Sequence, residues 1–357
     1  MQIKSENLVE HTGRLYYYDL LRSLLVVLVV IGHGTYYNIV TKFGGIYYAD
    51  IMKEQNVGQP VFYKLVSLLT GFIYTFHMPV FIALSGSIYA LATERTYSSL
   101  VFQKAKRLLI PFIVTWFVWN FPIKYLTGYY AGISIYKMLL QLILPAKVYL
   151  WYLESLFFIF VIFGLIRKLH ANQQTIVVGL FWIIGVLLYQ KLVQYHPLGD
   201  PLYYLGWFYL GYRVEDIIEI LKKKGLWNNL FMVSLFVIHM ITFCANRYFL
   251  RYGISSVCCK FVILPMFMFI ILNYLVRTIQ YKSKWLEKAG GYGMGIYLYA
   301  EPLNYLILWF FYTKCGITFF GTNVGAAVIY FSRILITPII AIGITWALKK
   351  MNLKYLY

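Results

Sequence analysis

The chain contains 357 residues, of which 61% are hydrophobic and only 13% are charged. A soluble domain is nearer half apolar and a quarter charged, so this composition excludes a soluble globular protein and predicts a polytopic membrane protein. The net charge of +19 does not indicate nucleic-acid binding, because the basic residues lie between hydrophobic segments, as the positive-inside rule describes. The four cysteines show neither metal-binding spacing nor a disulfide framework.

The apolar runs last about 15–22 residues, which fits membrane-spanning helices and not the short alternating strands of a β-barrel. We therefore expect an all-α fold, a polytopic transmembrane bundle of about ten helices forming a single integral membrane domain over residues 1–357. No cleavable signal peptide, internal repeat or separate soluble domain is evident. The expected spans are about 16–40, 77–92, 108–126, 149–166, 175–189, 202–214, 230–245, 259–276, 291–312 and 323–347.

Polar segments separate these spans. Residues 41–60 are expected to form an outer loop, and the stretch 61–92 is too long for one perpendicular span, so we divide it near His77-Met78-Pro79. Residues 93–107 are expected to be a cytoplasmic linker and residues 215–229 a cytoplasmic loop. Residues 127–148 are expected to form an outer segment that contains an amphipathic stretch. The side that carries both termini holds nineteen Lys and Arg residues against eleven on the other side, so we expect both termini to be cytoplasmic.

The first span contains an unusual set of polar residues. Eleven helical steps separate Arg22 from His33 and rotate the chain by about 1100°, which returns both residues to one face. Asp19 lies on the same side, one turn earlier. His33 is a candidate general base, because imidazole titrates near neutrality, although it could also serve packing. Arg22 is either a structural partner of Asp19 at the membrane boundary or a binding residue for phosphate.

Two further groups lie near helix starts. Residues 76–86 contain His77 and, near their end, Ser85-Gly86, which could form either a helix start with a packing notch or part of a site. The second group is the cluster of Lys104, Lys106 and Arg107. It provides positive-inside charge, and if it faces the inner end of the first span it joins Arg22 in a cationic pocket for a nucleotide phosphate.

Two carboxylates are expected within the membrane. Glu154 follows Trp151 by three residues, and Glu301 follows Tyr297 by four. Ionisable residues at membrane depth usually serve function, but Glu154, Glu301 and Arg333 could also pair with each other structurally. Aromatic residues at these positions suit sugar faces, although they also form interfacial belts.

In combination these motifs resemble the acyltransferase-3 family of integral membrane acyltransferases. The resemblance covers about residues 19–305 and rests on motifs in family order, which are Tyr18-Asp19-Leu20-Leu21-Arg22 with ten residues to His33, Phe76-His77-Met78-Pro79 through Ser85-Gly86, Lys104…Arg107…Pro111, Trp151-Tyr152-Leu153 and Gly295-Ile296-Tyr297-Leu298. It implies a ten-helix bundle in the bacterial inner membrane. Such a protein moves an acyl group, usually acetyl, from cytoplasmic acyl-CoA to a hydroxyl of a cell-surface saccharide or lipid-linked glycan.

The resemblance also implies roles for single residues. The arginine and histidine of the first helix are essential in the family, and basic residues before the third helix contribute, which correspond here to Arg22, His33, Lys104 and Arg107. Lys104 stands where arginine is frequent. Many members carry a histidine after the Ile-Tyr-Leu run of the ninth helix, where this chain has Tyr299-Ala300-Glu301-Pro302, so no role for that histidine can be carried over.

The expected mechanism follows from these positions. The phosphates of acyl-CoA, a co-substrate and not a bound cofactor, would bind Arg22, Lys104, Lys106 and Arg107, with Asp19 holding Arg22. His33 would take the proton of an acceptor hydroxyl that attacks the thioester. The glycan would enter on an acceptor side formed by His77, Ser85, Trp151, Glu154, Tyr297 and Glu301.

Some alternatives stay open at this point. A transporter or exporter of an acylated sugar or glycan would also place polar and aromatic residues at membrane depth. The sequence does not name the acceptor, the length of the acyl chain or the oligomeric state. It also does not separate direct transfer from an acyl relay. No metal site and no nucleic-acid partner are expected.

Overall fold

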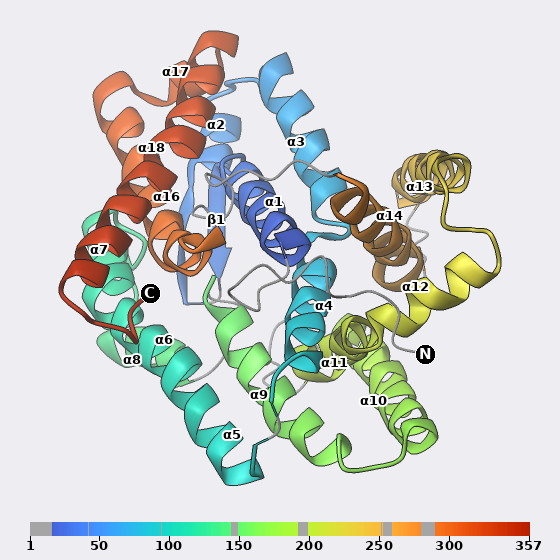
Figure 1. Cartoon of the computed structure of the whole chain (residues 1–357). Helices are drawn as coiled ribbons and strands as arrows, with labels where there is room; N and C mark the ends of the chain where they lie inside the picture. Colours follow the sequence, from blue (N-terminus) through green and yellow to red (C-terminus); the bar gives the residue numbers. More distant parts are fainter. Residues whose placement is uncertain are drawn as a thin grey trace. The chain divides into compact units, whose positions relative to one another are not determined.

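The computed structural model describes residues 16–41, 43–93, 95–143, 149–191, 199–250, 252, 259–279 and 290–357. Helices make up most of this part of the chain and strands very little of it, which confirms the predicted all-α membrane fold (Figure 1). Seven helical stretches among the described residues are long and apolar enough to cross a membrane. They are Tyr16–His33, Val61–Ala90, Tyr97–Leu126, Ala171–Leu188, Asn229–Leu250, Cys259–Thr278 and Asn323–Lys350. The count of ten spans and the cytoplasmic termini stay predictions.

The first helix is shorter than the sequence predicts. Helix α1 (Tyr16–His33) ends at His33, not near residue 40, and the chain turns into an antiparallel hairpin of β1 (Asn38–Thr41) and β2 (Gly44–Tyr47). The expected outer loop 41–60 is therefore wrong in part, because it contains β2 and α2 (Tyr48–Glu54). β-Branched residues favour the strand β1, and Gly44 at φ 138° adopts a backbone conformation that other residues rarely reach.

The predicted break in the long apolar stretch is confirmed. Helix α3 (Val61–Ile73) ends before residue 74, and α4 (His77–Ala90) begins at His77. Pro79 lies in the first turn of α4, where the missing N–H of proline leaves no helical bond unmade.

The next helix runs without interruption from Tyr97 to Leu126, so the predicted linker 93–107 is wrong over most of its length. Three α-helical segments, α5 (Tyr97–Lys104), α6 (Ile110–Thr115) and α7 (Phe121–Leu126), are joined by π-helical turns at Ala105–Leu109 and Trp116–Asn120.

Each π-helical turn in the described residues ends two residues before a proline. Pro111 and Pro122 occupy the second positions of α6 and α7, and Pro265 follows a third π-helical turn, Cys259–Ile263, in the same way. Proline has no N–H to donate to the carbonyl four residues before it. The turn before the proline therefore takes the π-helical pattern, in which hydrogen bonds span five residues, and the helix continues. The start predicted from the sequence for the span 108–126 falls within the first π-helical turn, although the helix begins at Tyr97.

Most of the remaining helices follow the expected spans within about five residues, and three short helices lie between those spans. They are α8 (Ile135–Ile143), α9 (Trp151–Ile166), α10 (Ala171–Lys191), α11 (Gly199–Tyr212), α12 (Val214–Lys223), α13 (Asn229–Leu250), α14 (Leu264–Thr278), α16 (Gly293–Cys315), α17 (Ile317–Phe320) and α18 (Asn323–Lys350). Helix α12 replaces much of the expected loop 215–229. Acidic residues in its first turn and lysines in its last turn match the helix dipole.

The chain divides into two compact units that are interleaved along the sequence. The first contains residues 1–27, 75–92 and 207–293, and the second contains residues 28–74, 93–206 and 294–357. In the first unit, Gly86 and Gly211 let the backbones of α4 and α11 approach closely, and the Ser87 hydroxyl donates to the Gly211 carbonyl at 3.0 Å. The single-domain organisation expected from the sequence stays a prediction.

The second unit has an aromatic core that joins the hairpin to the helices behind it. Its buried residues include Tyr37, Ile46, Tyr48, Met52, Ile123, Tyr129, Tyr130, Met138, Tyr305, Leu308, Ile317, Phe320 and Ile329. This core packs the hairpin together with residues of α2, α7, α16, α17 and α18.

Candidate functional site

The second unit brings His33 against Glu301. His33 is the last residue of α1, and its Nδ1 lies 2.5 Å from Oε2 of Glu301 on α16. Both side chains are largely buried, with 24% and 11% of their surfaces exposed. A carboxylate only accepts hydrogen bonds, so we assign the ring proton to Nδ1, which leaves Nε2 as the basic nitrogen.

Glu301 is itself held by a buried amide. The Nδ2 of Asn304, one turn further along α16, donates to Oε2 of Glu301 at 3.0 Å. The Oδ1 of the same amide accepts from Nε of Arg333 at 3.1 Å. Asn304 therefore links the Arg333 guanidinium to the Glu301 carboxylate through two hydrogen bonds, and the two charged groups do not contact each other directly.

Arg333 also fixes the end of the helix that carries His33. It lies within α18 with none of its surface exposed, and its two terminal nitrogens donate to the carbonyls of Tyr36 and His33, each at 2.7 Å. The last carbonyls of a helix have no partner within the helix and carry partial negative charge, which a cation compensates. The guanidinium thus sets the backbone position of His33.

An aromatic wall lies beside the histidine. The rings of His33 and Tyr74 are 6.4 Å apart, and the rings of Tyr36 and Tyr74 are 5.7 Å apart. Gly32 lies against Tyr74, whose ring occupies the space that any larger side chain at residue 32 would need.

Asp19 and Arg22 form the ion pair that their spacing indicated. Nη1 of Arg22 donates to Oδ1 of Asp19 at 2.9 Å, with the carboxylate buried and the guanidinium a quarter exposed. Gly290 and Gly293 lie next to this pair in the first unit, and neither adds a side chain there. The phosphate-binding role of Arg22 stays a prediction.

The basic cluster lies within a helix and not in the expected linker. Nζ of Lys104 lies 3.5 Å from the ring centroid of Phe160, and Nζ of Lys106 lies 4.2 Å from that of Phe102. Arg107 is exposed. Within the described part of the chain, Lys106 and Arg107 form no salt bridge.

The residues predicted on the acceptor side are found in different surroundings. In the first unit, His77 is buried at the start of α4, and the Ser85 hydroxyl donates to the carbonyl of Phe81 at 3.2 Å. In the second unit, Trp151 stacks on Tyr204 with ring centroids 5.2 Å apart.

Tyr297 and Glu301 occupy successive turns of one face of α16. The hydroxyl of Tyr297 donates to the carbonyl of Tyr149 at 2.5 Å, and the hydroxyl of Tyr149 donates to the carbonyl of Leu298 at 2.9 Å. Of the three groups that could pair structurally, Glu301 and Arg333 are linked through Asn304 and not directly, and Glu154 forms no ion pair with a described residue.

Sequence reasoning missed two features of this site. It did not pair Glu301 with His33, and it did not single out Asn304. The available signal was the spacing of Glu301 and Asn304 by three residues, which puts both polar groups on one face of an apolar helix.

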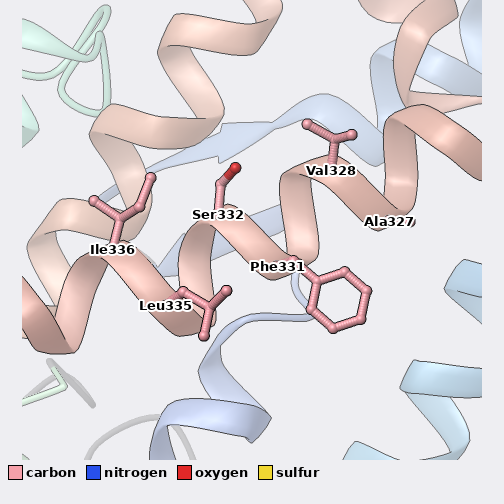
Figure 2. Close-up of a pocket in the computed structure, with 6 residues that line it drawn as sticks. All are labelled: Ala327, Val328, Phe331, Ser332, Leu335 and Ile336. Atoms are coloured by element: carbon pink, nitrogen blue, oxygen red, sulfur yellow. The ribbon is translucent and has the colours of Figure 1, made fainter.

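Other parts of the described chain offer less for chemistry. A surface hollow on α18 is lined by Ala327, Val328, Phe331, Ser332, Leu335 and Ile336, so it has one hydroxyl and no titratable group (Figure 2). No group of three or more His, Cys, Asp or Glu residues that could hold a metal ion occurs among the described residues.

Comparison with known proteins adds one finding to this geometry. A family model described as an acyltransferase domain, of the acyltransferase-3 type, matches residues 15–348, which is nearly the whole chain. No curated protein and no solved structure matches the chain.

Proposed function

The chain belongs to the acyltransferase-3 family and is a multi-pass membrane acyltransferase, and on that premise we propose a donor, an acceptor and a catalytic base for its reaction. The donor is cytoplasmic acyl-CoA, with acetyl as the acyl group that the family pattern favours. The acceptor is a hydroxyl of a cell-surface saccharide or a lipid-linked glycan. The base is His33, and the membrane is the bacterial inner membrane.

The observation that supports this proposal is the contact between His33 and Glu301. A carboxylate on Nδ1 holds the imidazole in one tautomer and stabilises the imidazolium that forms when Nε2 takes a proton.

In this proposal the His33–Glu301 pair carries out the proton transfers between the two substrates. Nε2 of His33 removes the proton of the acceptor hydroxyl, whose oxygen attacks the thioester carbon. The new C–O bond forms and the C–S bond breaks. The imidazolium returns its proton to the departing CoA thiolate, so the ester and free CoA leave a regenerated base.

Electrostatic binding of the donor is assigned to the basic cluster. Lys104, Lys106 and Arg107 lie on one helix in the second unit, and ammonium and guanidinium groups bind phosphate oxygens through charge-assisted hydrogen bonds. Arg22 is the sequence-based candidate for the same phosphates. His77, Ser85, Trp151, Glu154 and Tyr297 stay the candidates for glycan contact.

The test uses purified protein in detergent, radiolabelled acetyl-CoA and a crude extract of envelope glycans. Wild type should release CoA only when the extract is present, and His33→Ala should reduce that release by about 10²-fold or more. Arg22→Ala should raise the KM for acetyl-CoA. If the protein binds no acetyl-CoA and the variants behave like wild type, the acyl-transfer proposal is wrong and the transport alternative gains.

A further inference from the structure

A buried lysine near the candidate base has no partner of opposite charge. Lys124, in α7, has 1% of its surface exposed. Its Nζ lies 4.1 Å from the ring centroid of Tyr129 and 5.6 Å from that of Tyr305. Within the described residues, Nζ makes no salt bridge and no hydrogen bond.

An ammonium in this state is costly for the fold. Burial removes its water shell, and two aromatic faces replace only part of that hydration. Glu301 acts on Lys124 electrostatically, but its Oε2 already binds His33 and Asn304. An anion that arrives with a ligand would supply the counter-charge that Lys124 needs in order to stay protonated.

The lysine lies close to the reacting centre of the proposed function. Tyr305 follows Glu301 by four residues on α16, so its ring lies one helical turn further along the same face. Side chains one turn apart are about 5–6 Å apart, and Tyr305 lies 5.6 Å from Nζ, which places Lys124 on the order of 10 Å from the dyad.

Lys124 lies beneath a packed aromatic cover. Tyr129 is held in place by a hydrogen bond of 2.7 Å to the Thr41 hydroxyl, and its carbonyl accepts from the Gly45 amide at 2.9 Å. The hairpin β1–β2 thereby packs over the loop that follows α7. Lys124, Tyr129 and Tyr305 are all at most 3% exposed, so a bulky sugar does not reach the ammonium without displacing this packed cover.

We propose that Lys124 binds the terminal carboxylate of a dicarboxylic acyl group, of succinyl length, that acyl-CoA presents to His33. This rests on the proposed function but replaces acetyl by a diacid as the transferred acyl group, since acetyl has no group that would pair with the ammonium. The acyl chain is transferred as described above, and its distal carboxylate is not changed by the reaction.

The length of a four-carbon diacyl group fits the spacing. Three bonds separate its two carboxyl carbons, a distance of about 3.5 Å as in one residue of extended backbone. The attacking oxygen lies about 3 Å from the thioester carbon and hydrogen-bonds to His33, and the carboxylate lies about 2.8 Å from the ammonium. Together these contacts span roughly the same 10 Å that separates Lys124 from the dyad.

The test measures binding, which requires no acceptor. Dissociation constants for succinyl-CoA, acetyl-CoA and free CoA are measured by titration calorimetry on the full-length protein in detergent. Wild type should bind succinyl-CoA at least tenfold more tightly than acetyl-CoA. Lys124→Met should reduce that ratio to near one, and Lys137→Met, at an exposed lysine in α8, should leave it unchanged.

Thermal unfolding separates this role from a structural one. Methionine fills nearly the same volume without the buried charge, so Lys124→Met should raise the Tm of the ligand-free protein. Succinyl-CoA should then raise the Tm of wild type more than that of the variant.

Three results would overturn the inference while leaving the proposed function in place. One is equal loss of both acyl-CoA affinities in Lys124→Met together with a lower Tm, which indicates a structural lysine. Another is an unchanged ratio of the two affinities. The third is a change in the KM for an anionic acceptor glycan in Lys124→Met while the ratio of the succinyl-CoA and acetyl-CoA affinities stays as in wild type. Absence of any acyl-CoA binding in wild type would instead contradict the proposed function itself.

Discussion

Two clusters in this protein join a glutamate to an arginine, and they do so in opposite ways. In the first unit, Glu215 receives two hydrogen bonds directly from Arg277, at 2.7 and 3.0 Å, and one from Tyr18 at 3.1 Å. In the second unit, Asn304 lies between Glu301 and Arg333. In the direct bidentate pair, both carboxylate oxygens of Glu215 accept hydrogen bonds from the arginine. In the second cluster, the amide separates Arg333 from Glu301, so the carboxylate can pair with His33 instead. The arrangement of partners therefore distinguishes an ion pair that joins two helices from the pair that we propose as the catalytic base and its orienting carboxylate.

Removing the two carboxylate charges gives the largest expected difference between the clusters. Glu301→Gln keeps a group that can contact the ring but cannot stabilise the imidazolium, so kcat should fall by about 10²- to 10⁴-fold. Glu215→Gln should leave kcat within about twofold of wild type because it lies outside the proposed chemistry. The rate of CoA release at saturating donor checks both. Equal losses in the two variants would contradict the division of roles.

Removing the arginines should affect stability unequally. Arg333→Met leaves the carbonyls of His33 and Tyr36 and the amide of Asn304 without their donor, which should cost about 3–5 kcal/mol of unfolding free energy. Arg277→Met breaks a pair whose carboxylate is 57% exposed and should cost about 1 kcal/mol. Thermal unfolding in detergent measures both. A smaller loss for Arg333→Met than for Arg277→Met would be incompatible with this account.

Replacing the amide that separates Glu301 from Arg333 should have an intermediate effect on activity. Asn304→Leu keeps the approximate volume but removes the donor to Glu301 and the acceptor from Arg333, so kcat should fall by about tenfold through a misplaced carboxylate. The KM for acyl-CoA should change little. A pH–rate profile with an unchanged shape and an unchanged kcat would show that the amide does not position Glu301.

The smallest expected effect is the pH dependence that Glu215 contributes. Burial acts to raise the pKa of Glu215, but the hydrogen bonds and charge of Arg277 outweigh it, so the pKa lies below its ordinary value of 4.5. A lowered folded-state pKa stabilises the protein above the unfolded-state pKa, and this contribution is lost as the pH falls through the folded-state pKa. Between pH 6 and pH 3, the Tm of Glu215→Gln should therefore decline less than that of wild type. Parallel curves would contradict the assignment.

The sequence predicted those features that depend on residues near each other along the chain. The helical class, the break before His77 and the contact of Asp19 with Arg22 all follow from local composition or from a spacing of a few residues. Local rules failed at the start of the span 108–126, because the preceding linker that they predicted is part of a helix that begins at Tyr97.

The centre of the site depends on contacts that local rules cannot provide. His33 and Glu301 are 268 residues apart, and His33 and Arg333 are 300 apart. Single-sequence patterns indicate that each residue is unusual within its own helix, but packing alone decides which of them meet. Lys124 shows the same limit, because an isolated lysine near a span end resembles ordinary topogenic charge until its burial is known.

The π-helical turn Trp116–Asn120 has a consequence for how this helix tolerates insertions and deletions. It contains one residue more than an α-helical turn and lies between the basic cluster and Lys124. Deleting one residue there would rotate every side chain beyond it by about 100° about the helix axis. The angular phase between Arg107 and Lys124 is thus set by residue count. A change of length in this helix should be compatible with activity only when a second change of length restores the phase.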